Sequence, residues 1–122
     1  MGVVARIFVA LVALLHFGFL VLEMFLWTGS IGQRMFSMTP EFADQTAVLA
    51  ANQGLYNGFL AVGLLWGALR VSGDFMIFFL LCVIVAGVYG GLTAKMSILY
   101  IQAAPGLIAL LAVLAAKSRT HG

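Results

Sequence analysis

The chain has 122 residues, of which 64% are hydrophobic and only 8% are charged. Soluble domains usually have about a quarter of their residues charged, and a soluble fold of this length could not bury so much apolar surface. The formal net charge of +2 is too small, and the charges are too scattered, for a surface that binds nucleic acid. The composition therefore excludes an ordinary soluble domain and predicts an integral membrane protein.

Four segments are long and apolar enough to cross a bilayer, which takes about 20 residues of helix. They cover about 4–27, 45–69, 75–93 and 97–116, and the helix that contains the second segment is expected to begin outside the bilayer and cover about 40–69. The first run is longer than the apolar part of a signal peptide, and no small-residue cleavage site follows it, so we expect a retained helix. The prediction is an all-α membrane protein with a single four-helix transmembrane domain over residues 1–122.

The longest connection covers residues 28–44, with the sequence TGSIGQRMFSMTPEFAD, and its glycines indicate a turn. Within it, Thr39, Pro40 and Glu41 are typical of a helix start: a capping hydroxyl, a proline at the first helical position and an acid near the positive end of the dipole. The other connections are short, and short connections favour antiparallel neighbours. We therefore expect an antiparallel, up-down-up-down bundle.

The basic residues predict the orientation, because cytoplasmic loops carry an excess of Lys and Arg. In the predicted bundle, four basic residues share the side of the two termini and two lie on the opposite side, which favours both termini in the cytoplasm. The first group is Arg6, Arg70, Lys117 and Arg119, and the second is Arg34 and Lys95.

Polar residues inside the predicted spans are the candidates for function, since ionisable groups in a membrane are costly and usually face a bundle interior or a cavity. His16 and Glu23 lie two turns apart on the first helix, and Trp27 continues that stripe. The second helix carries a polar cluster in the run NQGLYN. The remaining candidates are Asn52, Gln53, Tyr56 and Asn57 of this cluster, Tyr89 on the third helix and Gln102 on the fourth.

Their depths point to a shared site. With each segment's midpoint at the bilayer centre, His16 and Asn57 lie near the centre and Glu23 lies about 10 Å toward the non-cytoplasmic side. Four others lie roughly 6–8 Å toward the same side, namely Asn52, Gln53, Tyr89 and Gln102. We interpret this as one polar pocket near the non-cytoplasmic face, with Glu23 neutral, paired or solvated. The alternative is that the amides and tyrosines only bond neighbouring helices together.

Other features predict no cofactor and no metal. Cys82 is a single cysteine in an apolar run and is expected to act as a small hydrophobic residue. His16, Glu23 and the amides would make a metal site poor in ligands.

Small residues recur every four positions, as in Gly54/Gly58 and Gly87/Gly91, and predict close helix packing within the chain or a homodimer seam. Pro105 predicts a kink in the fourth helix.

The sequence resembles the small bacterial membrane proteins catalogued as domain of unknown function 1304. The resemblance rests on HFGFLVLEMFLW, TPEF, LAANQGLYNGFLAVGLLWG and CVIVAGVYGGLT, and it covers nearly the whole chain. It implies four transmembrane helices in the bacterial inner membrane and no established activity.

Three functions fit these residues, and membrane lipids are partners in all of them. The first is binding or transport of a small polar or amphipathic ligand or a cation, with proton coupling through Glu23. The second is an enzyme acting on a lipid or isoprenoid, with Glu23 and His16 as acid and base. The third is a structural or accessory membrane subunit. We favour the first slightly.

Overall fold

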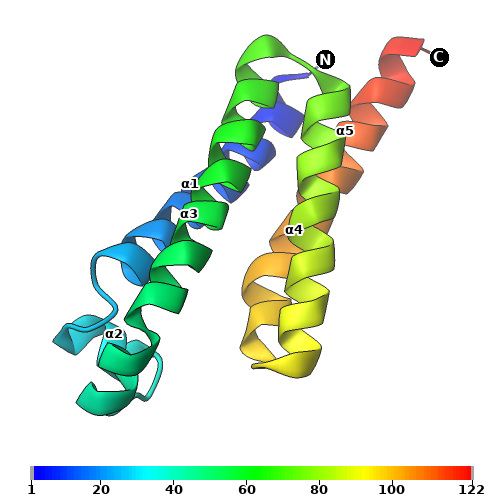
Figure 1. Cartoon of the computed structure of the whole chain (residues 1–122). Coiled ribbons are helices and arrows are strands. Elements are labelled where there is room, and N and C mark those ends of the chain that lie inside the picture. Colours follow the sequence, from blue (N-terminus) through cyan, green and yellow to red (C-terminus); the bar gives the residue numbers. More distant parts are fainter. Residues whose placement is uncertain (1, 122) are drawn as a thin grey trace. The chain divides into compact units, whose positions relative to one another are not determined.

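The computed structural model describes residues 2–121, with side chains to residue 119, and shows helices without strands in that range. Four helices or helical runs are long and apolar enough to cross a membrane, which confirms the predicted fold class. The elements are α1 (Val3–Met24), α2 (Ser30–Met35), α3 (Pro40–Arg70), α4 (Gly73–Thr93), the π-helix η1 (Leu99–Ala103) and α5 (Ala104–His121), all labelled or coloured by sequence in Figure 1.

The described chain divides into two compact units. One combines the residues up to Ala13 with those from Val62 onward, and the other consists of Leu14–Ala61. Both α1 and α3 therefore contribute to each unit. The packing below is given for each unit separately.

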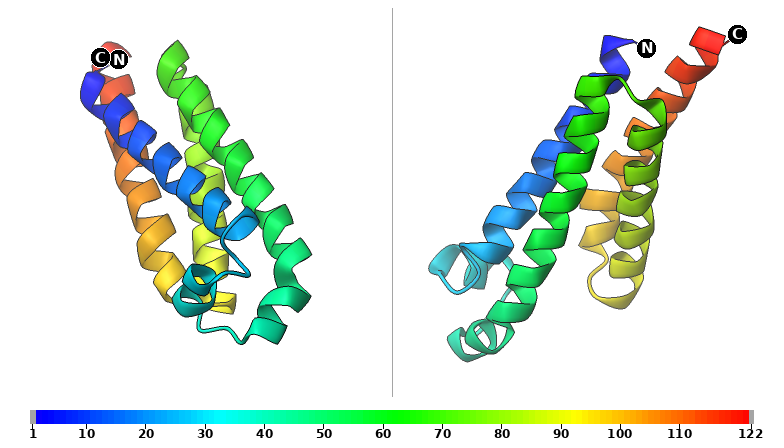
Figure 2. Two further views of the ribbon diagram at one scale, coloured as in Figure 1. Left: turned by 90° about the vertical axis from the view of Figure 1, so that its left-hand side faces the viewer. Right: turned by 45° about the horizontal axis from the view of Figure 1, so that its top comes forward.

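In the first unit, α4 and α5 run antiparallel (Figure 2). Glycines make the approach close: a Cβ on Gly87 would lie 2.8 Å from the Ala103 amide nitrogen, and one on Gly91 would lie 2.8 Å from the Leu99 Cβ. The predicted glycine stripe on the third helix is thus a seam within the chain. A homodimer stays a prediction, and it would need a different surface from this one.

The fourth span begins irregularly. The amide of Ala104 donates to the carbonyl of Leu99, the five-residue spacing of a π-helix, directly before Pro105. Proline has no amide hydrogen and its ring crowds the preceding turn, so the α-helical ladder cannot continue unchanged there. The kink at Pro105 stays a prediction, and the structure shows this π-helical turn directly before it, a feature that is frequent at functional sites.

One end of the first unit gathers the start of α1, the α3–α4 connection and the end of α5. The Arg6 guanidinium donates through Nε to the Ala68 carbonyl over 2.8 Å, and Lys117 pairs with Asp74 at 2.9 Å. At the same connection, Ser72 caps α4 by accepting from the Phe75 amide. These contacts agree with the predicted alternation of helix direction, while the up-down order across the membrane stays a prediction.

The second unit contains the seam between α1 and α3. A Cβ on Gly54 would lie 2.6 Å from the Met24 Cγ, and one on Gly58 would lie 2.7 Å from the Leu20 Cδ1. The residue numbers of the contacts fall along α1 as they rise along α3, so the two helices are antiparallel here. The start of α3 is as predicted, because Thr39 Oγ1 accepts from the Phe42 amide at 3.2 Å.

The first helix is shorter than predicted. It ends at Met24 instead of about residue 27, and the chain then folds back into the short helix α2, which we did not predict. Gly32 makes the fold possible, because it lies so close to the Leu26 and Trp27 carbonyls that no Cβ would fit. An apolar run such as Phe25-Leu26-Trp27 continues a hydropathy pattern equally well whether it forms helix or turn.

Candidate functional site

The candidate site is a side-chain pair that joins α1 to α3. The Asn57 side-chain amide donates from Nδ2 to Oε1 of Glu23 over 2.5 Å. Both side chains are partly buried. This contact links the only acidic residue of α1 to the polar cluster of α3, and both residues were predicted site residues.

The glycine seam brings these two side chains together. A Cβ on Gly54 would lie 3.2 Å from the Glu23 Cβ, and Gly54 is three residues from Asn57, or nearly one turn. The glycines of α3 do not form a face separate from all of its polar residues. Asn57 instead adjoins the glycine face, so the close backbone approach and the hydrogen bond belong to one seam.

Asn57 lies well inside the length of α3. Asn57 precedes Arg70, the last residue of α3, by 13 positions, which is about 20 Å along the helix axis. The hydrocarbon core of a bilayer is about 30 Å thick. Asn57 is therefore far enough from Arg70 to lie at the depth of the apolar layer, while Glu23 is the second-last residue of α1 and lies near the end of its own helix.

Glu23 has no basic side chain beside it within its unit. Residues 14–61 contain one histidine, His16, and one other basic residue, Arg34. Arg34 lies on α2, where its Nε donates to the Ser30 carbonyl at 3.4 Å. Within residues 14–61 the carboxyl group of Glu23 has the Asn57 amide as its side-chain hydrogen-bond partner. A carboxylate can accept up to about four hydrogen bonds, so capacity remains for a proton or a cation.

His16 and Trp27 flank Glu23 along the first helix and its extension. His16 is fully buried and packs edge-to-face on Phe19, with ring centroids 5.0 Å apart. Trp27 lies beyond the end of α1, and its indole nitrogen donates to Thr46 Oγ1 at 2.9 Å. Trp27 therefore fixes the turn to α3 and does not bond Glu23. Thr46 was missed from the sequence because nothing local distinguishes it from an ordinary helix threonine.

The rest of the α3 cluster points elsewhere. Asn52 is exposed and donates to the Val48 carbonyl of its own helix at 2.9 Å. Gln53 is exposed, and Tyr56, 62% exposed, meets Phe59 edge-to-face. Of the four polar residues in NQGLYN, Asn57 is the one that bonds Glu23.

Tyr89 and Gln102 belong to the other unit. Gln102 lies in η1 and donates through Nε2 to the Val83 carbonyl of α4 at 3.0 Å, while the Tyr89 side chain is 71% exposed. That these two share a pocket with Glu23 stays a prediction. Among the described residues, no group of three or more His, Cys, Asp and Glu side chains could hold a metal ion.

Fold and site together define a small, all-α protein with four membrane-spanning helices and a carboxyl–amide pair inside one helix seam. The family model described as "Protein of unknown function (DUF1304)" matches residues 10–114. The uncharacterized protein YpaA of Lactococcus lactis subsp. lactis (strain IL1403) is 31% identical over 115 residues, covering 91% of this chain and 97% of the relative. No solved structure matches. The chain belongs to this family of unknown function.

Proposed function

We propose that the chain is a membrane-embedded binding or transport module in which Glu23 takes up either a proton or a cationic ligand. The observation that carries the proposal is the Asn57–Glu23 hydrogen bond in the seam between two helices that are apolar enough to span a membrane, with no Lys or Arg beside the carboxyl group in its unit. An isolated carboxylate is very unfavourable in hydrocarbon. A bound proton removes that cost, and so does a bound cation.

The ligand class follows from the neighbourhood of the pair. Asn57 holds the carboxyl group through one oxygen, and the residues of α1 before Glu23 and of α3 after Asn57 are apolar or glycine over the nearest turn. A small hydrophobic cation suits such a place, because its charge would face the carboxylate and its apolar part would remain in the hydrocarbon. Binding would then displace the proton, which couples the two events.

The test uses tetraphenylphosphonium as the probe and the purified chain in proteoliposomes. Equilibrium binding is measured together with proton release in weak buffer, for the wild type, Glu23→Gln and the matched control Glu41→Gln. Glu41 is the exposed acid in the first turn of α3, away from the seam. Comparable thermal midpoints of the three proteins establish that each is folded.

We expect the wild type and Glu41→Gln to bind the probe and release protons. Glu23→Gln should bind at least about tenfold more weakly, equivalent to 1.4 kcal/mol, and release none. Unchanged binding in Glu23→Gln would rule the proposal out. Absence of probe binding by the wild type would contradict the hydrophobic-cation class and favour a structural subunit, in which the Asn57 and Gln102 bonds only hold helices together.

A further inference from the structure

The segment from Phe25 to Phe36, here called the 25–36 segment, lies between the end of α1 and the start of α3 and contains α2. Its backbone is hydrogen-bonded to itself. The Gly32 amide donates to the Leu26 carbonyl at 3.2 Å, and the Phe36 amide donates to the Gly32 carbonyl at 3.1 Å. Backbone groups that are already paired can enter a bilayer without the penalty that open N–H and C=O groups suffer there.

Polar side chains of the 25–36 segment are also bonded locally. Gln33 donates through Nε2 to the Thr28 carbonyl at 2.9 Å, and Arg34 donates to the Ser30 carbonyl. Trp27 donates to Thr46 at the start of α3. The segment thus presents few unsatisfied groups, and its tryptophan ties it to the next helix.

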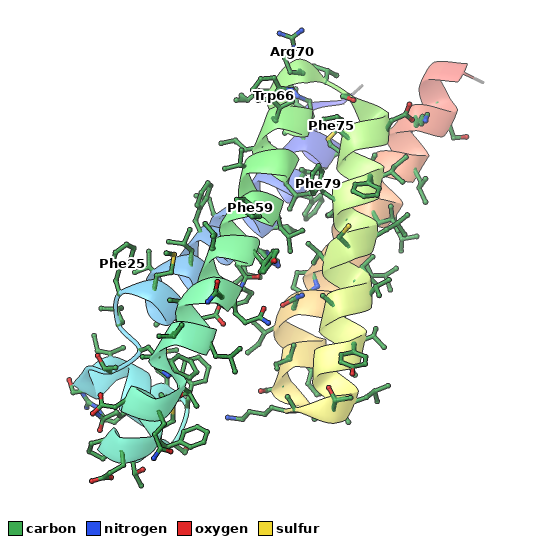
Figure 3. The ribbon with its side chains drawn as sticks, in the orientation of Figure 1. Phe25, Phe59, Trp66, Arg70, Phe75 and Phe79 are labelled. Atoms are coloured by element: carbon green, nitrogen blue, oxygen red, sulfur yellow. The ribbon has the colours of Figure 1, made fainter. Side chains whose placement is uncertain are left out.

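The outward side chains are large and apolar. Phe25 is 71% exposed, Ile31 47%, Met35 54% and Phe36 38%. Ile31 and Met35 are one helical turn apart and therefore share a stripe of α2. Figure 3 shows the Phe25 side chain pointing away from the ribbon at the end of α1. Ser30 and Arg34 form a second stripe, which makes the short helix two-sided.

The packing fixes which side of α2 faces outward. Gly32 is buried against the Leu26 and Trp27 carbonyls. The Trp27 and Phe36 rings lie 4.9 Å apart. Because the inner side of α2 is anchored in this way, the helix cannot rotate to bury Ile31 and Met35, and these side chains stay on its outer side.

We infer that the 25–36 segment lies in the interfacial layer of the bilayer that the chain spans, with Phe25, Ile31 and Met35 among the lipid chains. The segment is covalently continuous at both ends with helices that have the length and apolarity of membrane spans, so lipid is the surface that its outward side meets. Short two-sided helices with aromatic residues lie at this depth, with the polar stripe toward the headgroups.

The test is site-directed spin labelling of the full chain in phosphatidylcholine liposomes, in a Cys82→Ala background. Met35→Cys and Ile31→Cys report the apolar stripe, and Ser30→Cys is the matched control on the same helix. Collision rates with oxygen, which concentrates in lipid, are compared with those of a water-soluble nickel chelate. We expect labels at 31 and 35 to collide more with oxygen, and the label at 30 to collide more with the chelate.

Equal access of the nickel chelate to positions 30 and 35 would overturn the inference, because the stripe would then face water. Position 35 could instead be protected from both reagents, with the protection relieved when the labelled protein is diluted with unlabelled chain. That result would also overturn the inference, because the stripe would then contact a second copy of the chain. A second measurement leaves α2 unaltered. In a Trp66→Phe background, brominated lipids should quench Trp27 most strongly when the bromines lie near the headgroups.

Discussion

The Asn57 side-chain amide reaches Oε1 of Glu23 from the middle of a 31-residue helix, at the level where Gly54 and Gly58 allow α1 to approach closely. The hydrogen bond and the backbone approach depend on each other. If the helices separated, the amide could not reach the carboxyl group. If the amide were lost, the carboxyl group would remain in the seam without its polar partner.

A double-mutant cycle measures this contact. Glu23→Ala and Asn57→Ala should show a coupling free energy of about 0.6 kcal/mol, the average for hydrogen bonds between membrane helices, and no more than about 1.7 kcal/mol. Reversible unfolding by steric trapping in bicelles supplies the values. Asn52→Ala is the matched control, since its amide bonds the Val48 carbonyl of its own helix. A coupling between Asn52 and Glu23 as large as that of Asn57 would contradict the geometry.

Gly54→Ala tests the seam sterically. The added methyl group would meet the Met24 Cγ at 2.6 Å and the Leu20 carbonyl oxygen at 3.3 Å, and overpacking of this kind costs about 1–3 kcal/mol. Gly18→Ala in α1 is the control, because a Cβ there meets no atom within 4 Å. Thermal unfolding in detergent should show destabilisation only for Gly54→Ala. Equal stability of the two variants would mean that the seam is looser than described.

Gln102→Leu tests the bond between η1 and α4. Losing the hydrogen bond that Gln102 donates to the Val83 carbonyl should lower stability by about 0.5–1.5 kcal/mol, the usual net contribution of one hydrogen bond. Gln53→Leu is the matched control, because it makes the same substitution at an exposed position. We expect it to leave stability within about 0.5 kcal/mol. A larger loss for Gln53→Leu than for Gln102→Leu would show that Gln53 has an unrecognised packing role.

The topology prediction is checked by cysteine labelling in intact cells with a membrane-impermeant maleimide, in a Cys82→Ala background. Arg6 and Lys117 lie at one end of the first unit, and cytoplasmic faces are enriched in basic residues. Ser37→Cys, in the turn before α3, should react from outside. Ser118→Cys should react only after permeabilisation. The reverse labelling pattern would invert the orientation.

Much of the architecture could be predicted from the sequence. Apolar runs of about 20 residues predict membrane-spanning helices. Thr39 and Pro40 predict the start of α3, and in the structure α3 begins at Pro40 with Thr39 as its cap. These features depend on neighbouring residues, so the local sequence contains them. The end of α1 cannot be predicted in this way, because the turn at Gly32 depends on its contacts with the Leu26 and Trp27 carbonyls.

The site was only partly predictable for a related reason. Asn52 and Asn57 are the same residue type in one motif, yet one bonds its own helix and the other bonds Glu23. Which face of α3 meets α1 decides between them, and hydropathy does not contain that information. The glycines were the available signal: Gly54 and Gly58 lie beside Asn57 on the helix surface and mark the face that approaches another backbone.

The protonation state of Glu23 is the most direct test of the proposed function. Glu23 is one of four acidic residues, and the other three, Glu41, Asp44 and Asp74, are exposed. In an infrared spectrum of the reconstituted chain at neutral pH, we predict a carboxylic acid C=O band that is lost in Glu23→Gln and disappears when tetraphenylphosphonium is added to the wild type. A wild-type spectrum identical to that of Glu23→Gln in this region would contradict proton binding at Glu23.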